Sequence, residues 1–232
     1  MFPLSAEVRT KLQTVCMQDT YSLSRKLEEV NVSQAHRTQR ERTEATRRAL
    51  ITAARGLFAE EGYAAVGTER IARTAGVTRG ALYHQYADKS ELFAAVLDQV
   101  EAEIAGRMQA AATEVGDPSD TVAVLVAGGD AWLDACAEPE LQRIVLLDGP
   151  SVLGWERWRE ICLRHSVGLV AGILADGMER GVIARQPIEP LTHVLVGAVD
   201  EAALHISRAE DPVAARADMQ PVLHRLAGAL LG

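Results

Sequence analysis

Two short stretches with helical spacing of apolar residues are separated by Gly76-Val77, and this arrangement constrains the fold more than any other part of the sequence. Helices are expected over 68–75 and from Thr78 to about Tyr83. Glycine tolerates the left-handed backbone that a tight turn between helices needs. The pattern therefore predicts a helix-turn-helix. The residues expected to close the small core beneath it are Ile71, Ala75, Val77 and Leu82.

The second helix of such a motif enters the DNA major groove, and its exposed positions suit this role. Gly80 and Ala81 allow close approach to DNA, and Arg79 can donate two hydrogen bonds to O6 and N7 of a guanine. Tyr83 offers a hydroxyl to a phosphate. Lys89, at the start of the next helix, adds a positive charge beside free backbone N–H groups. These residue types predict a surface that reads double-stranded DNA.

The net charge of −8 is unevenly distributed along the 232 residues. Residues 37–89 hold ten Lys and Arg against six Asp and Glu, which gives +4, so the remainder carries 14 against 26, which gives −12. Phosphate affinity depends on local rather than total charge, so a basic segment in an acidic protein is compatible with DNA binding.

The N-terminal part divides into a polar extension over 1–36 and an arginine-rich arm at the start of the DNA-binding domain, which is expected over 37–92. Five arginines fall within 37–48, directly before the helix-turn-helix. We expect the extension to be mobile. The arm is interpreted as a source of phosphate or minor-groove contacts, with a solvated helix start as the alternative. The arm residues assigned to DNA are Arg37, Arg40 and Arg42.

Helical periodicity continues through the rest of the chain, and no segment alternates as a strand would. A helix is expected over 43–61, with Gly62 as its stop, and another from a cap at Asp88 to about Thr113. The sequence predicts an all-α fold with about nine helices after the extension, and a C-terminal domain over 93–232. Its helices are expected from Asp117-Pro118, from Pro139 to about Leu147, over about 156–180 and 187–208, and from Asp211 to about Leu231. A break is expected at Asp148-Gly149-Pro150, followed by a loop over 151–154.

Residues 45–96 closely resemble the DNA-binding domain of the TetR family of bacterial repressors. The residues that carry the resemblance are Phe58, Gly62, Thr68, Ile71, Ala72, Ala75, Gly76, Val77, Leu82, Tyr83, Tyr86, Lys89 and Leu92. Glu69 departs from members that place a basic residue near the first contact helix. With the arm, the resemblance assigns the DNA contacts to Arg42, Thr68, Thr78, Arg79, Gly80, Ala81, Tyr83, His84 and Lys89.

The resemblance also implies a C-terminal domain that binds a small molecule. The chain gathers aromatic, Met and other bulky residues there, which suits an apolar or aromatic effector between helices. A role in the core alone is the alternative for each of them. Asp130, Asp134, Asp148 and His165 are the polar candidates. The residues assigned to the pocket are Met108, Leu125, Trp132, Leu147, Leu153, Trp155, Trp158, Cys162, His165 and Met178.

The last two helices carry wide apolar arcs, and Gly197 and Ala198 permit close helix approach. Two such helices from each copy could form a four-helix interface, so a homodimer is expected. A twofold dimer requires a palindromic operator with half-sites about one helical turn apart or a multiple of it. The predicted function is a transcriptional regulator, most simply a repressor released from DNA by its ligand. Activation is also open.

Other function classes lack a signal in the sequence. No nucleophile motif, paired-His spacing or phosphate loop favours an enzyme, and no cofactor or metal is expected. The three cysteines lack metal-ligand spacing and are interpreted as free thiols, with a redox or metal switch as the alternative. No apolar run is long enough to span a bilayer, so a cytoplasmic protein without membrane contact is expected. The competing hypothesis is a helix-turn-helix protein that binds DNA or partners without a ligand.

Overall fold

The computed structural model describes residues 39–231, which are mostly helical and include no strand. This confirms the predicted all-α class. The chain divides into two compact units, residues 1–48 and 49–232. In the first unit the described residues, 39–48, are helical. The predicted extension and Arg37 lie outside the described residues, and the predicted domain boundary after residue 92 stays a prediction.

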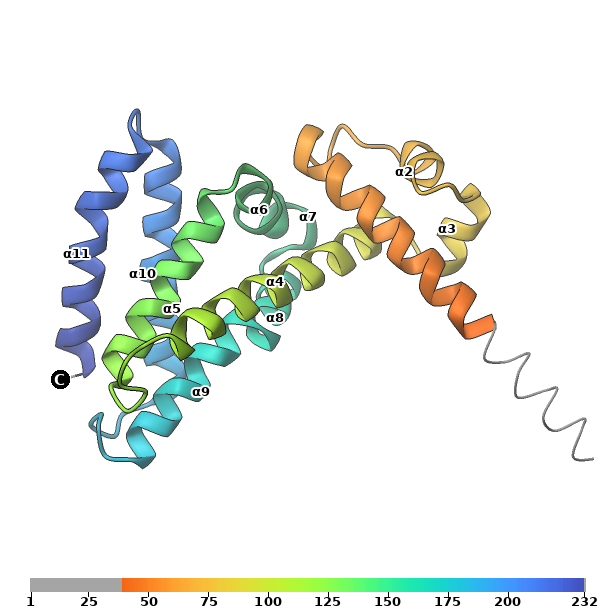
Figure 1. Cartoon of the computed structure of the whole chain (residues 1–232). Helices are drawn as coiled ribbons and strands as arrows, with labels where there is room; N and C mark the ends of the chain where they lie inside the picture. The colour runs from red at the N-terminus through yellow and green to blue at the C-terminus, as the bar shows by residue number, and fades with distance from the viewer. Residues whose placement is uncertain (1–38, 232) are drawn as a thin grey trace, which may run out of the picture. The chain divides into compact units, whose positions relative to one another are not determined.

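The second unit opens with the head, residues 49–88, in which helical residues 49–61 precede α2 (Thr68–Thr74) and α3 (Arg79–Gln85) (Figure 1). Gly62 ends the first helix with a φ of 81°, and its N–H donates to the Phe58 carbonyl. Gly76 lies between α2 and α3 with a φ of 68°. Both glycines adopt the backbone that L-residues avoid, so the predicted stop and turn are confirmed.

An aromatic cluster fixes the head onto α4 (Lys89–Thr113). The ring centroid of Phe58 lies 5.5 Å from that of Tyr63 and 5.4 Å from that of Phe93, the latter on α4. Ile71 and Leu82 are fully buried beneath α2 and α3, as predicted. The head and the first turns of α4 therefore share one hydrophobic core.

The helix α4 links the head to the remaining helices. The Asp88 carboxylate caps it by accepting the Glu91 N–H at 2.8 Å, as the sequence predicted. Its 25 residues span roughly 37 Å at the helical rise. Its buried face continues through Val100 and Ile104 to Met108, where it packs on α5.

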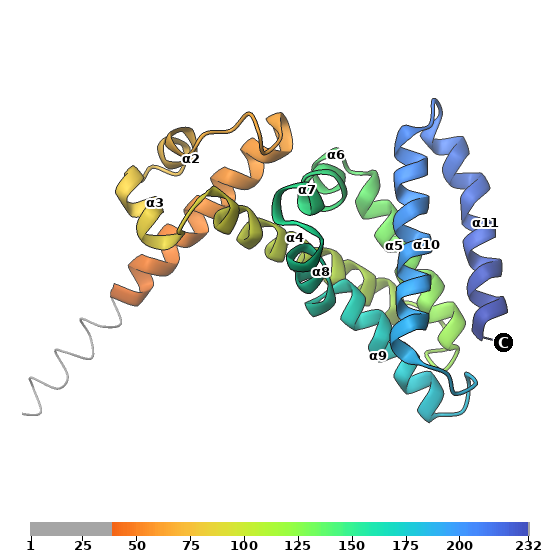
Figure 2. The same cartoon turned by 180° about the vertical axis from the view of Figure 1, so that it is seen from behind.

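The body, residues 114–231, packs against one side of the second half of α4 (Figures 1 and 2). Helix α10 packs against α9, α11 and α5. The body's elements are α5 (Thr121–Ala137), α6 (Pro139–Gln142), the π-helix η1 (Arg143–Asp148), α7 (Gly149–Leu153), α8 (Trp155–Arg164), α9 (Ser166–Glu179), α10 (Ile188–Arg208) and α11 (Pro212–Leu231).

The predicted break at Asp148-Gly149-Pro150 is wrong. The chain stays helical from η1 into α7, because Pro150 falls in the first turn of α7, where no backbone N–H is needed. The break comes at Gly154, which has a φ of 74°. The loop expected over 151–154 is therefore helical up to Leu153.

Two other helix boundaries differ from the prediction. The single helix expected over 156–180 is two helices, α8 and α9, bent by 53° at His165. Asp120 rather than Asp117 caps α5, because Asp117 instead accepts hydrogen bonds from Ser119 within the preceding turn. In the described range no single helix is long and apolar enough to cross a membrane, and only the bent α8–α9 pair taken together meets that length and composition.

Candidate nucleic-acid interface and ligand pocket

The exposed face of α3 carries the side chains that the sequence assigned to DNA reading. Arg79, Gly80, Tyr83 and His84 are exposed, and Ala81 is partly buried. Thr78 precedes α3 and caps it, because its hydroxyl accepts the Ala81 N–H at 3.1 Å. Of the remaining residues in that assignment, Thr68 is partly buried on α2, and Arg42 is exposed in the described part of the first unit.

Arg79 is held by side chains from two helices. Its guanidinium donates to the Glu69 carboxylate at 2.8 Å and lies 5.5 Å from the Tyr83 ring centroid. The Tyr83 hydroxyl lies 3.2 Å from the Thr68 hydroxyl. That hydrogen bond, together with the nearby Arg79, lowers the pKa of Tyr83. Because the Arg79–Glu69 pair is exposed to solvent, it is weak enough to exchange for a DNA partner.

Lys89 is engaged with the loop that precedes α2. Its ammonium donates to the carbonyls of Tyr63 and Val66, both at 2.9 Å, and lies 3.9 Å from the Tyr63 ring centroid. Burial lowers the pKa of this ammonium. An ammonium has three donors, so one remains for the phosphate contact that the sequence suggested. Lys89 thus also fixes the loop against the start of α4.

A second set of contacts joins η1 to the head. The Asp148 carboxylate accepts the Tyr63 backbone N–H at 2.9 Å, and the Arg143 guanidinium donates to the Glu60 carbonyl at 3.2 Å. We call this pair of bonds the η1–head contact. Sequence reasoning placed Asp148 among the polar pocket candidates and missed this role, because no local signal links residues 85 positions apart.

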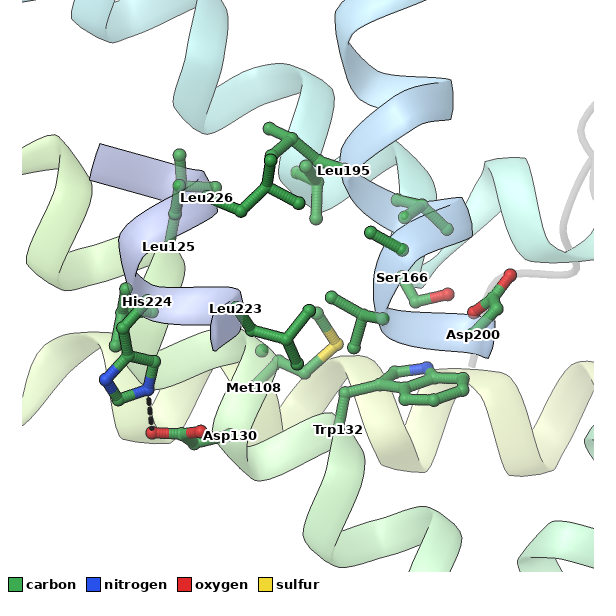
Figure 3. Close-up of a pocket in the computed structure, with 17 residues that line it drawn as sticks. Met108, Leu125, Asp130, Trp132, Ser166, Leu195, Asp200, Leu223, His224 and Leu226 are labelled. Carbon is green, nitrogen blue, oxygen red and sulfur yellow. Dashed lines mark hydrogen bonds and ion pairs between the residues drawn. The ribbon is translucent and has the colours of Figure 1, made fainter. Parts of the chain in front are cut away.

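A cavity of about 80 Å³ lies between α4, α5, α9, α10 and α11 (Figure 3). Of the residues assigned to the pocket from the sequence, it brings together Met108, Leu125 and Trp132. Asp130, one of the polar candidates, also lines it. Its other lining residues include Ser166, Leu195, Asp200, Leu223, His224 and Leu226.

The other assigned pocket residues lie outside this cavity, so the structure does not bring the predicted set together. Trp155 is 65% exposed, and Leu147 is exposed too. Trp158 is buried in the core, where its indole N–H donates to the Val145 carbonyl at 3.0 Å. His165 pairs with Asp98 at 3.0 Å. Cys162 is buried in the main core, Met178 lies in a smaller core cluster, and Leu153 packs partly buried against the main core.

Beside the cavity lies a buried polar cluster that sequence reasoning missed. Glu101 is 1% exposed and accepts hydrogen bonds from the Ser166 hydroxyl at 2.7 Å and the Cys162 thiol at 3.5 Å. Burial raises the pKa of Glu101, and burial also raises the pKa of Asp200, to about 7. A signal existed for Glu101, because it shares the helical phase of the apolar residues Leu97 and Ile104.

The two described cysteines, Cys136 and Cys162, are free and buried. Burial raises the pKa of both thiols, which keeps them protonated and unreactive. Cys16 lies outside the described residues. Within residues 39–231, no group of three or more His, Cys, Asp or Glu side chains is placed to hold a metal ion.

Comparison with known proteins matches both parts of the site. Residues 50–96 match the model for bacterial regulatory proteins of the tetR family, and residues 122–230 match the tetracyclin repressor-like C-terminal domain. The transposon Tn10 TetC protein of Escherichia coli is 27% identical over 167 residues, which cover 72% of this chain and 83% of TetC. The HTH-type transcriptional repressor SCO4008 of Streptomyces coelicolor is 30% identical over 145 residues, which cover 60% of this chain and 68% of SCO4008.

A crystal structure from Pectobacterium atrosepticum, described as a TetR-family transcriptional regulator, superposes with a TM-score of 0.68. It is 34% identical in sequence, and the match covers 83% of this chain and 97% of that one. The first matched segment contains α3, and the second contains the cavity-lining residues of α5, α9, α10 and α11.

Proposed function

Because the chain belongs to the TetR family of bacterial transcriptional regulators, we propose that it is a repressor that a small, largely apolar ligand releases from a palindromic operator. One observation carries this proposal. Helix α4 begins beside the head at Lys89, and Met108, near its other end, lines the cavity. A single continuous helix thus connects the candidate DNA-reading surface with the candidate effector site.

The DNA side of the proposal rests on the chemistry of α3. Arg79 supplies a guanidinium that can donate two hydrogen bonds to one guanine, and Gly80 adds no bulk between the helix and the base edges. Tyr83 and Lys89 serve the phosphates. The net charge of +4 over residues 37–89 attracts the DNA backbone to this end of the chain.

The size of the cavity supports a ligand-driven change of shape. About 80 Å³ is smaller than the roughly 150 Å³ cavity that admits benzene. A ligand larger than that requires the surrounding helices to separate, and Met108 places α4 among them. Such a ligand binds the separated arrangement better than the closed one, which is what a shift between two states requires. Movement of α4 would alter the position of the head to which it is fixed.

The dimer side of the proposal rests on α10 and α11. Val194 on α10 is 55% exposed, and on α11 Val213 and Val222 are 81% and 48% exposed. Apolar side chains on the same two helices of a second copy would cover them, and the resulting twofold symmetry requires two operator half-sites.

The test is recovery of bound genomic DNA, followed by affinity measurements on the enriched sequences. The wild-type protein is expected to enrich palindromic sites. Arg79→Ala should weaken binding to them by about 1–3 kcal/mol and relax the preference at one position of each half-site. Arg185→Ala removes an equal charge from an exposed position of the body and serves as the control. Unchanged affinity in Arg79→Ala would show that α3 is not the reading helix.

A further inference from the structure

We propose that the cavity selects an amphipathic organic cation, with its ammonium group at Asp200 and a slender apolar body between α5, α10 and α11. This inference rests on the proposed function of the cavity as the effector site. It goes beyond that function by assigning a charge to the ligand and a residue that recognises it.

The two carboxylates that line the cavity differ in their hydrogen bonding. Asp130 is satisfied, because it accepts from the Gln220 amide at 2.9 Å and pairs with the His224 ring at 3.0 Å. Asp200 also lines the cavity, yet across residues 39–231 no hydrogen bond or ion pair reaches its carboxylate. A partly buried carboxylate without a partner is costly, so a donor supplied by a ligand would be favourable at this position.

The charges around Asp200 favour a cationic donor over a neutral one. The Glu101 carboxylate acts on Asp200 as a like charge, and within residues 39–231 Arg159 is the one guanidinium whose charge acts on it. Arg159 is 8% exposed and donates to the His193 Nδ1 at 2.9 Å. Because the guanidinium can only donate, the His193 Nδ1 accepts in this bond. Among the described residues no donor reaches Asp200, so when its carboxylate is ionised an ammonium group would supply both a hydrogen bond and the opposite charge, whereas a neutral donor would supply only the hydrogen bond.

The remaining walls define the rest of the ligand. Figure 3 shows the Trp132 ring and the Ser166 hydroxyl at the Asp200 end of the cavity, with Leu195 and Leu223 further along. An aromatic face attracts a cation, particularly where water is excluded. The apolar wall favours an alkyl or aryl chain. An anionic ligand would meet two carboxylates, with the His224 ring already paired to one of them.

The test compares three isosteric probes on the full-length protein by isothermal titration calorimetry: octylammonium, octan-1-ol and octanoate. At pH 8 octylammonium is expected to bind tightest and octanoate weakest. Asp200→Asn should weaken octylammonium binding by about 10–100-fold, the effect of losing a hydrogen bond to a charged group, and change octan-1-ol binding little. Glu201→Gln is the matched control, because it alters the next residue of α10, which is exposed and lies outside the cavity.

The pH dependence gives a second measurement. Burial raises the pKa of Asp200 to about 7, so its carboxylate ionises between pH 6 and 8. Octylammonium affinity should therefore rise over that range in wild type. The groups whose charges act on this carboxylate are Arg159 and Glu101. The charge of Asp200 in turn raises the pKa of the Cys136 and Cys162 thiols. His224, on α11, also lines the cavity. The part of the rise that Asp200→Asn abolishes is therefore the part due to Asp200.

Octanoate binding as tight as octylammonium, an unchanged octylammonium affinity in Asp200→Asn, or no octylammonium binding at all would each overturn the proposal. Calorimetry is performed without DNA. If the charge assigned to the ligand is wrong, the calorimetric comparison of the three probes shows it. If the proposed regulatory function is wrong, operator binding stays the same whichever ligand occupies the cavity.

Discussion

At the scale of single residues, Gly149 is a position where one methyl group should disturb the core. A Cβ there would lie 2.7 Å from Cδ1 of Trp158 and 3.1 Å from the Ile144 carbonyl oxygen. The Trp158 ring cannot retreat without losing its hydrogen bond to the Val145 carbonyl. Gly149→Ala should therefore lower the free energy of unfolding by about 1–3 kcal/mol in thermal or urea unfolding.

Gly106→Ala is the control for that substitution. It lies within α4, and a Cβ there meets nothing within 4 Å. Alanine loses less conformational freedom than glycine when a helix forms, so this variant should gain roughly 0.5–1 kcal/mol. Equal stability of the two variants would mean that the packing of Trp158 on Gly149 is not as described.

Lys89 is the residue for which a structural role and a DNA role must be separated. Lys89→Ala should weaken binding to all DNA sequences and make the slope of log affinity against log salt shallower by about one unit, if its third donor serves a phosphate. Loss of only the Tyr63 and Val66 bonds would lower the stability of the head and leave the slope as it is. Fluorescence anisotropy at several salt concentrations, with Arg185→Ala as control, distinguishes the two.

At the scale of elements, the η1–head contact is expected to set the stability of the loop after the first helix. Asp148→Ala removes the acceptor of the Tyr63 N–H, so hydrogen exchange at this amide should accelerate by about tenfold, which corresponds to roughly one hydrogen bond. Asp148→Asn keeps an acceptor oxygen and should stay near wild type. Identical exchange in wild type and Asp148→Ala would show that this bond does not hold the loop.

The elements also show which features a sequence can reveal. The head was predictable because its signals are local: Gly62 and Gly76 mark a stop and a turn, and Asp88 marks a cap. The break at Gly149-Pro150 was predicted wrongly, because the same dipeptide also suits the first turn of a helix. The bend at His165 carries no Gly or Pro that would announce it.

The candidate site was only partly predictable, for a related reason. Met108, Leu125 and Trp132 were found because bulky residues in helical phase face the interior. Asp200 was missed, because only the packing of α10 against α5 and α9 places its carboxylate on the cavity wall. Trp155 was assigned to the pocket on its bulk alone, and it is exposed.

In the whole molecule, a basic segment with the proposed DNA-reading surface precedes an acidic remainder that holds the cavity. The proposed coupling runs through α4, which contacts the head core at Phe93 and the cavity at Met108. By reciprocity, a ligand that weakens operator binding must itself bind less tightly to the DNA-bound protein. This coupling therefore needs a test of its own, separate from either binding event.

Its most direct test is operator affinity by fluorescence anisotropy, with and without a cavity occupant whose saturation is verified by calorimetry on the same protein. Octylammonium and octan-1-ol both serve as occupants, so the outcome does not depend on the charge assigned to the ligand. Saturation of the cavity is expected to weaken operator binding by about 5–150-fold, the usual range of coupling between two sites. Operator affinity that stays within twofold of its ligand-free value while the cavity is demonstrably occupied would contradict the proposed coupling.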